Sequence, residues 1–217
     1  MNFDVTHPWR FVRDLAAEWM GPLTPLDGYP DADLAGIRMP DALRRAYRLL
    51  GRRDDLTSNQ DQLVPPSKLA PEADGRLVFR RENQACTAWA VADVEHPDPP
   101  VEFLVGAEWR PFLTSTSLAC AEMVLSETLL GWDDHFDNRW VDRAAIGAVD
   151  RVFTRVPFPE YPMWAVPNGP PVRWYSGDDC LLRCDAEEWL WVIARSPAAL
   201  DAVYAAVPGE WELRTRR

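Results

Sequence analysis

Apolar residues recur at helical spacing near the start of the chain. In residues 8–20, Trp9, Val12, Leu15 or Ala16, and Trp19 fall three to four positions apart and share one face of a helix. A Gly-Pro pair ends this pattern at position 21. The following residues, 21–38, are rich in Gly, Pro and Asp, so we expect a loop with at most one helical turn.

The segment PDALRRAYRLL, residues 40–50, gives the clearest helical signal in the sequence. Pro40 suits a first helical turn, and Gly51 suits the position just after a helix. Leu43 and Tyr47 belong to its apolar stripe, whereas three arginines take the solvent side. A third helix is predicted over residues 117–130, capped by one of the three hydroxyl residues at 115–117, with Leu118, Ala121, Leu125 and Leu129 along one face.

Period-two patterns predict three strands between these helices, at residues 76–81, 85–93 and 100–105. The prolines of HPDPP, residues 96–100, cannot donate to a strand ladder, so that stretch is expected to be a loop. Trp89, in the middle strand, is expected to anchor the core.

The last third of the chain has a pattern of its own. Residues 141–153 favour a short helix, and the proline-rich residues 156–171 favour irregular structure. Three strands are then predicted, followed by a helix with Ser196 as its N-cap and Pro197 in its first turn. The three strands cover residues 172–175, 180–184 and 188–195.

This order of elements, with hairpin connections, predicts an α+β fold with a mainly antiparallel twisted sheet flanked by helices. We expect an N-terminal helix and loop over residues 1–34 and a core domain over residues 35–131. Residues 132–217 are expected to add a β-β-β-α segment that packs on the same domain.

The net charge of the chain limits the classes of partner that it is expected to bind. The chain has 217 residues and a formal net charge of −11, and such an acidic field disfavours nucleic acid and anionic membranes as direct partners. The same field allows a basic protein partner, but many proteins are acidic only for solubility. The sequence contains no run of about 18 apolar residues, so no transmembrane helix is predicted.

Cysteine usage points to a reducing compartment. The four cysteines do not have the spacing of a secreted disulfide framework, and the N-terminus has no apolar signal region, so we expect a cytoplasmic protein. Cys180 and Cys184 would lie on the same side of a strand and are interpreted as buried core thiols. Cys86 with His96 or His135 is the one conceivable nucleophilic pair.

The acidic segment WDDHFDN, residues 132–138, is the best candidate for metal chemistry. Asp133, Asp134, His135 and Asp137 could ligate a divalent ion, which would suit a metal-dependent hydrolase. Their position just past a predicted helix is more typical of a solvated surface loop. Because the chain has no nucleotide-binding or hydrolase signature, we expect no enzyme activity, no cofactor and no metal.

The segment VFRRENQACTAWAV, residues 78–91, raises a different question. Glu82, Asn83 and Gln84 stand where a hairpin would normally place Asn-Gly or Asp-Gly. Their side chains can bond to the local backbone and replace a glycine-based turn. The alternative is a direct contact with a partner protein.

Several segments together resemble the SUKH superfamily, small α+β proteins that include bacterial immunity proteins. The resemblance rests on Pro40, Leu43, Tyr47 and Gly51, then on Leu77, Phe79, Glu82, Asn83, Gln84 and Trp89, then on Trp109 before the helix at 117–130. It covers about residues 35–131, and the C-terminal residues exceed the minimal family domain.

The resemblance implies a non-enzymatic protein-binding module, most readily an immunity protein that neutralises a basic toxin domain such as a nuclease. A regulatory scaffold that recruits cellular proteins is the second reading, and the metal-dependent hydrolase is the third. The expected partner contacts are Asp54, Asp55, Glu82, Asn83, Asp133, Asp134 and Asp137.

Overall fold

The computed structural model describes Asp4, residues 6–131 and residues 135–214. The chain divides into two compact units: an N-terminal unit, residues 6–131, and a C-terminal unit, residues 132–217 together with residues 1–5. Both units combine helices with an antiparallel sheet, so the predicted α+β class is confirmed. The division after Gly131 coincides with the predicted end of the core domain, and the N-terminal helix lies in the same unit as that core.

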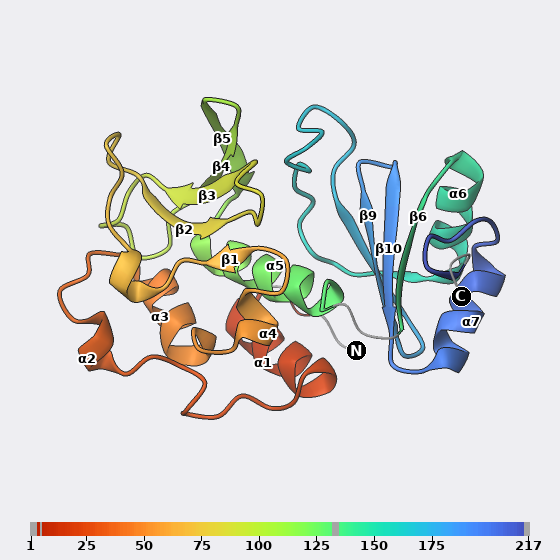
Figure 1. The fold of residues 1–217 in the computed structure, drawn as a ribbon, viewed down its shortest axis with the longest axis horizontal. Coiled ribbons are helices and arrows are strands. Elements are labelled where there is room, and N and C mark those ends of the chain that lie inside the picture. Colours follow the sequence, from red (N-terminus) through yellow and green to blue (C-terminus); the bar gives the residue numbers. More distant parts are fainter. Residues whose placement is uncertain (1–3, 5, 132–134, 215–217) are drawn as a thin grey trace. The chain divides into compact units, whose positions relative to one another are not determined.

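The sheet of the N-terminal unit is a meander of five strands that lie side by side in chain order (Figure 1). Helices lie on one side of it. The strands are β1 (Gln62–Leu63), β2 (Leu77–Arg81), β3 (Ala88–Val91), β4 (Val101–Val105) and β5 (Glu108–Leu113). The helices are α1 (Pro8–Trp19), α2 (Asp31–Leu34), α3 (Asp41–Leu50), α4 (Asp54–Thr57) and α5 (Thr116–Leu129), with a 3-10 turn, η1 (Pro66–Lys68).

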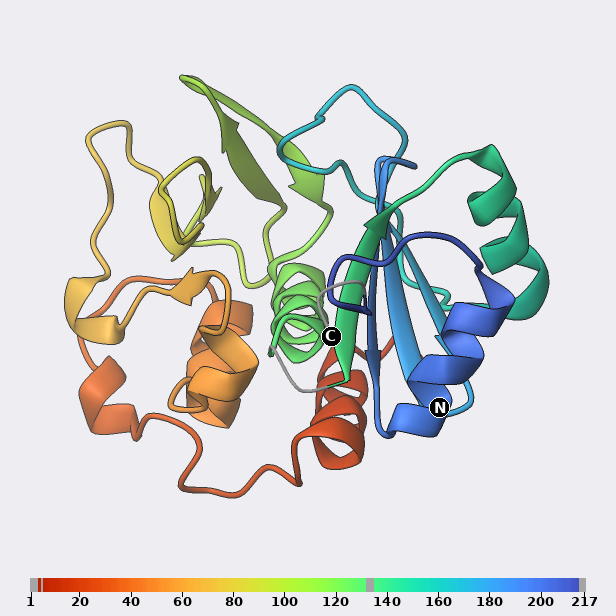
Figure 2. The same cartoon turned by 45° about the vertical axis from the view of Figure 1, so that its right-hand side comes forward.

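Helix α5 forms the centre of this unit, and α1, α3 and α4 pack against it (Figure 2). Ser115 caps it, its hydroxyl oxygen accepting the Leu118 N–H at 3.3 Å. Almost every residue of the helix is buried, including Glu122 and Glu127. The predicted single apolar stripe is therefore too narrow, because a helix covered on all sides buries polar positions as well. Leu118, expected on that stripe, is only half-buried.

Predicted elements α1, α3, β2, β3 and β4 are confirmed. Strand β5 was not predicted, because Pro111 and the partly exposed residues around it give no clean alternation. It forms a hairpin with β4, in which Leu104 pairs with Trp109.

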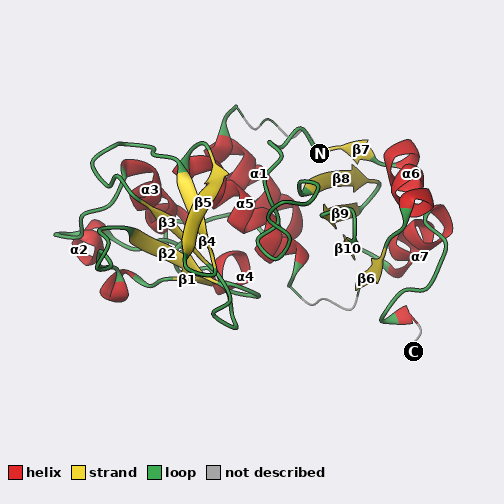
Figure 3. Ribbon diagram, turned by 90° about the horizontal axis from the view of Figure 1, so that it is seen from above, coloured by secondary structure: helices red, strands yellow, loops and turns green. Residues whose placement is uncertain are grey.

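The C-terminal unit has a second five-stranded antiparallel sheet, in the order β6-β10-β9-β8-β7. Helices α6 and α7 lie along the same side of it (Figure 3). Apolar residues of the sheet and of both helices form one buried cluster, which includes Cys180, Leu182 and Cys184. The elements are β6 (Phe136–Trp140), α6 (Arg143–Val152), β7 (Thr154–Arg155), β8 (Arg173–Gly177), β9 (Cys180–Asp185), β10 (Trp189–Ala194) and α7 (Pro197–Ala206).

The predicted β-β-β-α segment corresponds to β8, β9, β10 and α7 and is confirmed, including its N-cap: the Ser196 hydroxyl oxygen accepts the Ala199 N–H at 3.2 Å. Strand β6 was not predicted, because its sequence FDNRW is mostly polar. Helix α6 confirms the short helix predicted over residues 141–153. Together with β6, β7 and α6, the residues expected to extend the preceding domain form a unit with its own sheet and its own core.

Helix length sets a limit on membrane insertion. The longest helix, α5, has 14 residues, and no helix in the described ranges is long and apolar enough to cross a membrane.

Candidate functional site

The turn between β2 and β3, residues 82–87, is held together without glycine. One oxygen of the Glu82 carboxylate accepts the backbone N–H groups of Gln84 and Cys86, at 2.8 and 3.0 Å. The backbone of Glu82 donates to the Thr87 carbonyl at 3.1 Å and accepts from the Ala85 N–H at 2.9 Å. The local-bonding interpretation of Glu82 is therefore confirmed, and its prediction as a partner contact is corrected, because the side chain is buried in these bonds.

Backbone conformation explains why the turn needs this carboxylate. Ala85 has a φ of 60°, in the left-handed region that favours glycine and costs other residues about 1 kcal/mol. The bonds to buried Glu82 offset that cost on both sides of Ala85. As a result, Asn83, Gln84, Ala85 and Cys86 are exposed on a fixed backbone, and Asn83 stands where a partner can reach it.

The strands below the turn are fixed as well. The Thr87 hydroxyl donates to the Leu104 carbonyl at 2.7 Å, which ties the end of the turn to β4. Trp89 is buried, as predicted, and the Arg80 guanidinium lies over its ring at 4.5 Å from the centroid. The β2–β3 turn is thus tied to three paired strands of the sheet.

Arg80 is the centre of a buried ion cluster that sequence reasoning missed. Its side chain is 3% exposed and forms ion pairs with Asp61, Glu122 and Glu127, at 2.9, 2.7 and 3.0 Å. Arg80 comes from β2 and both glutamates come from α5, so the cluster joins the sheet to the central helix. Nothing in the FRRE segment distinguishes buried Arg80 from exposed Arg81.

Neutral donors complete the ion cluster. The Glu127 carboxylate accepts the backbone N–H groups of Gln60 and Asp61, at 2.7 and 3.2 Å. Burial raises the pKa of Glu127, although Arg80 and the N–H of Gln60 oppose the change. Burial alone would lower the pKa of Arg80, but the three carboxylates outweigh it and the pKa is raised. The ion cluster is buried, and it links strand β2 to helix α5.

Two of the predicted contact acids, Asp54 and Asp55, lie in helix α4. Asp55 is engaged within the molecule, because both its oxygens accept hydrogen bonds from the Arg53 guanidinium at 2.7 Å. The same bonds raise the pKa of Arg53. Asp54 is exposed. Of this pair, Asp54 is the better candidate for a partner contact.

Asp137 is not a solvated loop acid, so its prediction as a surface contact is corrected. It is fully buried in β6. One oxygen accepts the N–H groups of Asn138 and Leu213, at 2.7 and 2.8 Å. The other accepts the Tyr204 hydroxyl at 2.7 Å and the Arg214 N–H at 3.1 Å. The carboxylate holds the C-terminal segment against β6, and three of its four donors come from residues far along the chain.

The structure does not test the rest of the acidic segment as a metal site. Asp133 and Asp134 lie outside the described residues. Within the ranges that the structure describes, no three His, Cys, Asp or Glu side chains are grouped to hold a metal ion. The oxygens of Asp137 already accept four hydrogen bonds. Asp137 is therefore not available to a metal ion, and the metal-dependent hydrolase otherwise stays a prediction, because Asp133 and Asp134 are not described.

The cysteines divide by exposure. Cys180 and Cys184 are buried core thiols, as predicted, and burial raises their pKa values to about 11 and about 12. Burial likewise raises the pKa of Cys120 to about 12. Cys86 is exposed in the β2–β3 turn. The ring Nδ1 of His96, its suggested partner, accepts the Asp98 N–H at 3.1 Å.

No protein-family model, no curated protein and no solved structure matches this chain. The resemblance of residues 35–131 to the SUKH superfamily stays a prediction.

Proposed function

We propose that this chain is a non-enzymatic protein-binding module that neutralises a basic toxin domain by direct binding, as an immunity protein would. The observation that carries the proposal is the β2–β3 turn, in which Glu82 fixes the backbone while Asn83 and Gln84 are exposed. Loops held on rigid scaffolds are where proteins most often place recognition residues.

A fixed turn favours binding because its backbone is already ordered before the partner arrives, so less conformational entropy is lost on binding. Ordering a flexible loop at an interface costs about 0.5–1.5 kcal/mol for each immobilised side chain, and a preorganised backbone reduces the total. The amides of Asn83 and Gln84 each offer donors and acceptors, so they can bond to a partner's backbone or side chains.

Net charge supports a basic partner. A chain of charge −11 attracts cationic proteins over a distance and speeds their association. Asp54, exposed on α4, remains available to such a partner. The association rate is therefore expected to fall as salt is added, whereas the dissociation rate changes less.

The test is co-expression with the toxin domain encoded by the neighbouring gene, followed by calorimetry on the purified pair. Wild-type protein should restore growth and bind the toxin. Asn83→Arg and Gln84→Arg place a bulky cation on the turn and should weaken binding by about 30-fold or more, because like charges and lost hydrogen bonds cost several kcal/mol at an interface.

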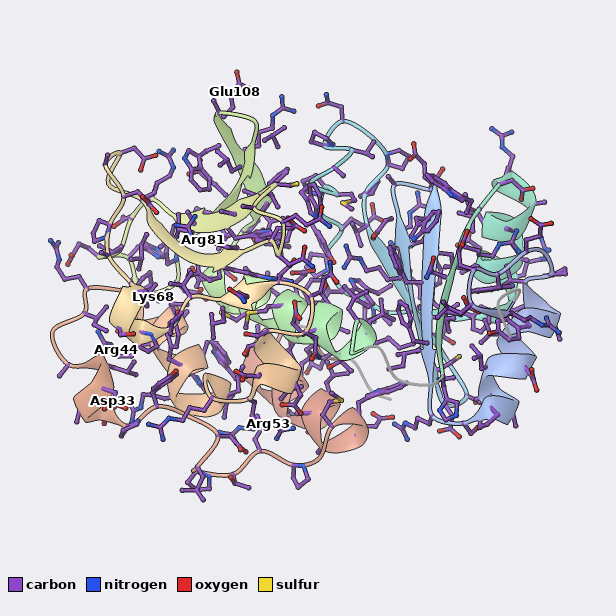
Figure 4. The ribbon with its side chains drawn as sticks, viewed as in Figure 1. Asp33, Arg44, Arg53, Lys68, Arg81 and Glu108 are labelled. Atoms are coloured by element: carbon purple, nitrogen blue, oxygen red, sulfur yellow. The ribbon has the colours of Figure 1, made fainter. Side chains whose placement is uncertain are left out.

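The matched control is Ala107→Arg at the tip of the β4–β5 hairpin, next to Glu108 (Figure 4). Ala107 is equally exposed on the same sheet, and its variant should bind like wild type. Equal weakening by all three variants would mean that the β2–β3 turn is not the contact. If no neighbouring gene encodes a toxin and no protein partner copurifies, the immunity function is wrong.

A further inference from the structure

A groove on the N-terminal unit collects arginines although the chain as a whole is acidic. It has a volume of about 480 Å³ and lies between helices α1 and α3. Its lining residues are Arg13, Asp41, Arg44, Arg45, Arg48 and Leu49.

The amphipathic pattern of α3 places its arginines in this groove. Leu43, Tyr47 and Leu50 are buried, which leaves the arginines of the helix on its outer side. Arg44 and Arg48 are four residues apart and so are neighbours on the helix surface. Arg13 adds a fourth guanidinium from the exposed side of α1.

Arg44 is held in place without losing its charge. Its guanidinium donates to the backbone carbonyls of Leu34 and Ile37, at 2.9 and 2.7 Å, between α3 and the segment that contains α2 (Figure 4). Both acceptors are neutral, so the positive charge is oriented and not cancelled. A fixed guanidinium loses less side-chain entropy when an anion binds.

The other arginines are compensated weakly. The Arg45 guanidinium lies over the Trp9 ring, 5.2 Å from its centroid, which orients it without an opposite charge. Arg48 pairs with Asp31 at 3.1 Å, but both side chains are more than half exposed, so the pair is easily exchanged. The groove itself contributes one carboxylate, Asp41, against four guanidinium groups.

We propose that this groove binds a small molecule that carries a phosphate group. Guanidinium groups match phosphate oxygens with paired N–H donors, and several of them converging from two helices suit a tetrahedral dianion better than one planar carboxylate. The volume falls in the usual range of ligand sites, about 300–1,000 Å³. Leu49 offers apolar contact for the body of the ligand.

The proposal is independent of the proposed function, because the groove is built by helices and the toxin contact is assigned to the β2–β3 turn. Nucleic acid is the less favoured occupant, since a chain of charge −11 repels an extended polyanion outside the groove.

The experiment is a titration of purified protein with phenyl phosphate at constant ionic strength, followed by nuclear magnetic resonance and calorimetry. Phenyl phosphate carries a dianion and a small apolar body, and benzoate serves as its single-carboxylate counterpart. We expect saturable binding of phenyl phosphate with shifts in α1 and α3, and binding of benzoate that is weaker by about tenfold.

Arg13→Gln and Arg45→Gln should each weaken phenyl phosphate binding by about tenfold, because each removes a charged donor. Arg10→Gln is the matched control: Arg10 is exposed on α1, pairs with Asp14 at 3.6 Å and does not line the groove. Circular dichroism verifies that each variant folds.

Three results would overturn the proposal. They are the absence of saturable binding by phenyl phosphate, equal weakening in Arg10→Gln, and stronger binding of a single-stranded oligonucleotide that the groove variants abolish. None of them bears on the toxin-binding assay, so the two proposals fail separately.

Discussion

The two units of the molecule bury negative charge in different ways. In the N-terminal unit, the carboxylates of the ion cluster surround the Arg80 guanidinium. In the C-terminal unit, Asp137 is surrounded by neutral N–H and O–H donors from the backbone and from Tyr204. Both arrangements join residues that are distant in sequence.

Because of this difference, we expect the two sites to lose stability for different reasons when a charged side chain is removed. Removal of a buried cation leaves carboxylates that repel one another where water cannot screen them. Removal of a buried acceptor leaves peptide N–H groups unsatisfied, which costs about 1–3 kcal/mol for each group. The first loss is electrostatic and affects the whole cluster, whereas the second is local.

The largest effect is expected for Arg80→Ala, which leaves three buried carboxylates without their cation. It should lower the free energy of unfolding by about 3–5 kcal/mol, as measured by chemical denaturation. Hydrogen exchange should accelerate most in β2 and α5. The adjacent Arg81→Ala is the control, because Arg81 is half-exposed and its pair with Glu72 contributes less than about 1 kcal/mol. Similar losses in both variants would contradict the role given to the cluster.

A smaller effect is expected for Asp137→Asn. The amide group can accept on one side only, so its NH₂ faces two donors and about 2–3 kcal/mol of stability is lost. Exchange of the amides at 212–214 should accelerate, since the segment loses its anchor. Asp142→Asn is the control, because Asp142 caps α6 through the Ala145 N–H and asparagine caps equally well. Unchanged exchange at 212–214 would refute the anchor.

The smallest effect is expected in how the free energy of unfolding changes with pH. Because burial raises the pKa of Glu127, the folded protein binds this proton more tightly than the unfolded chain does. The contribution to stability is complete below about pH 4.5, the ordinary value, and is lost as pH rises through the higher folded pKa. Denaturation curves of Glu127→Gln measured from about pH 4 to about pH 8, mostly above the ordinary value, should lack that decline.

Asp54→Asn provides the comparison for the pH series, since Asp54 is exposed and its variant should follow the wild-type curve. A decline of equal steepness in Glu127→Gln would show that another group carries the pH dependence.

The sequence predicts the parts of the fold that depend on local chemistry. The apolar stripe of α3 and its flanking Pro and Gly predict that helix, and Ser196 and Pro197 predict the start of α7. Strands β9 and β10 are apolar enough to be recognised from composition. The α+β class follows from the order of such elements.

The rest depends on contacts that no local pattern records. Strand β6 is polar, and its Asp137 is buried only because Tyr204, Leu213 and Arg214 supply donors from the end of the chain. Arg80 is buried because Glu122 and Glu127 face it from α5. At the β2–β3 turn, by contrast, the local bonds of Glu82 were predictable, because donor and acceptor are two to four residues apart.

The turn built on Glu82 has one more implication. Its shape depends on a carboxylate and on main-chain groups, so the side chains at 83, 84 and 86 carry no structural duty. These three positions can therefore be substituted while the hairpin keeps its form, so the surface chemistry of the turn can vary independently of the fold.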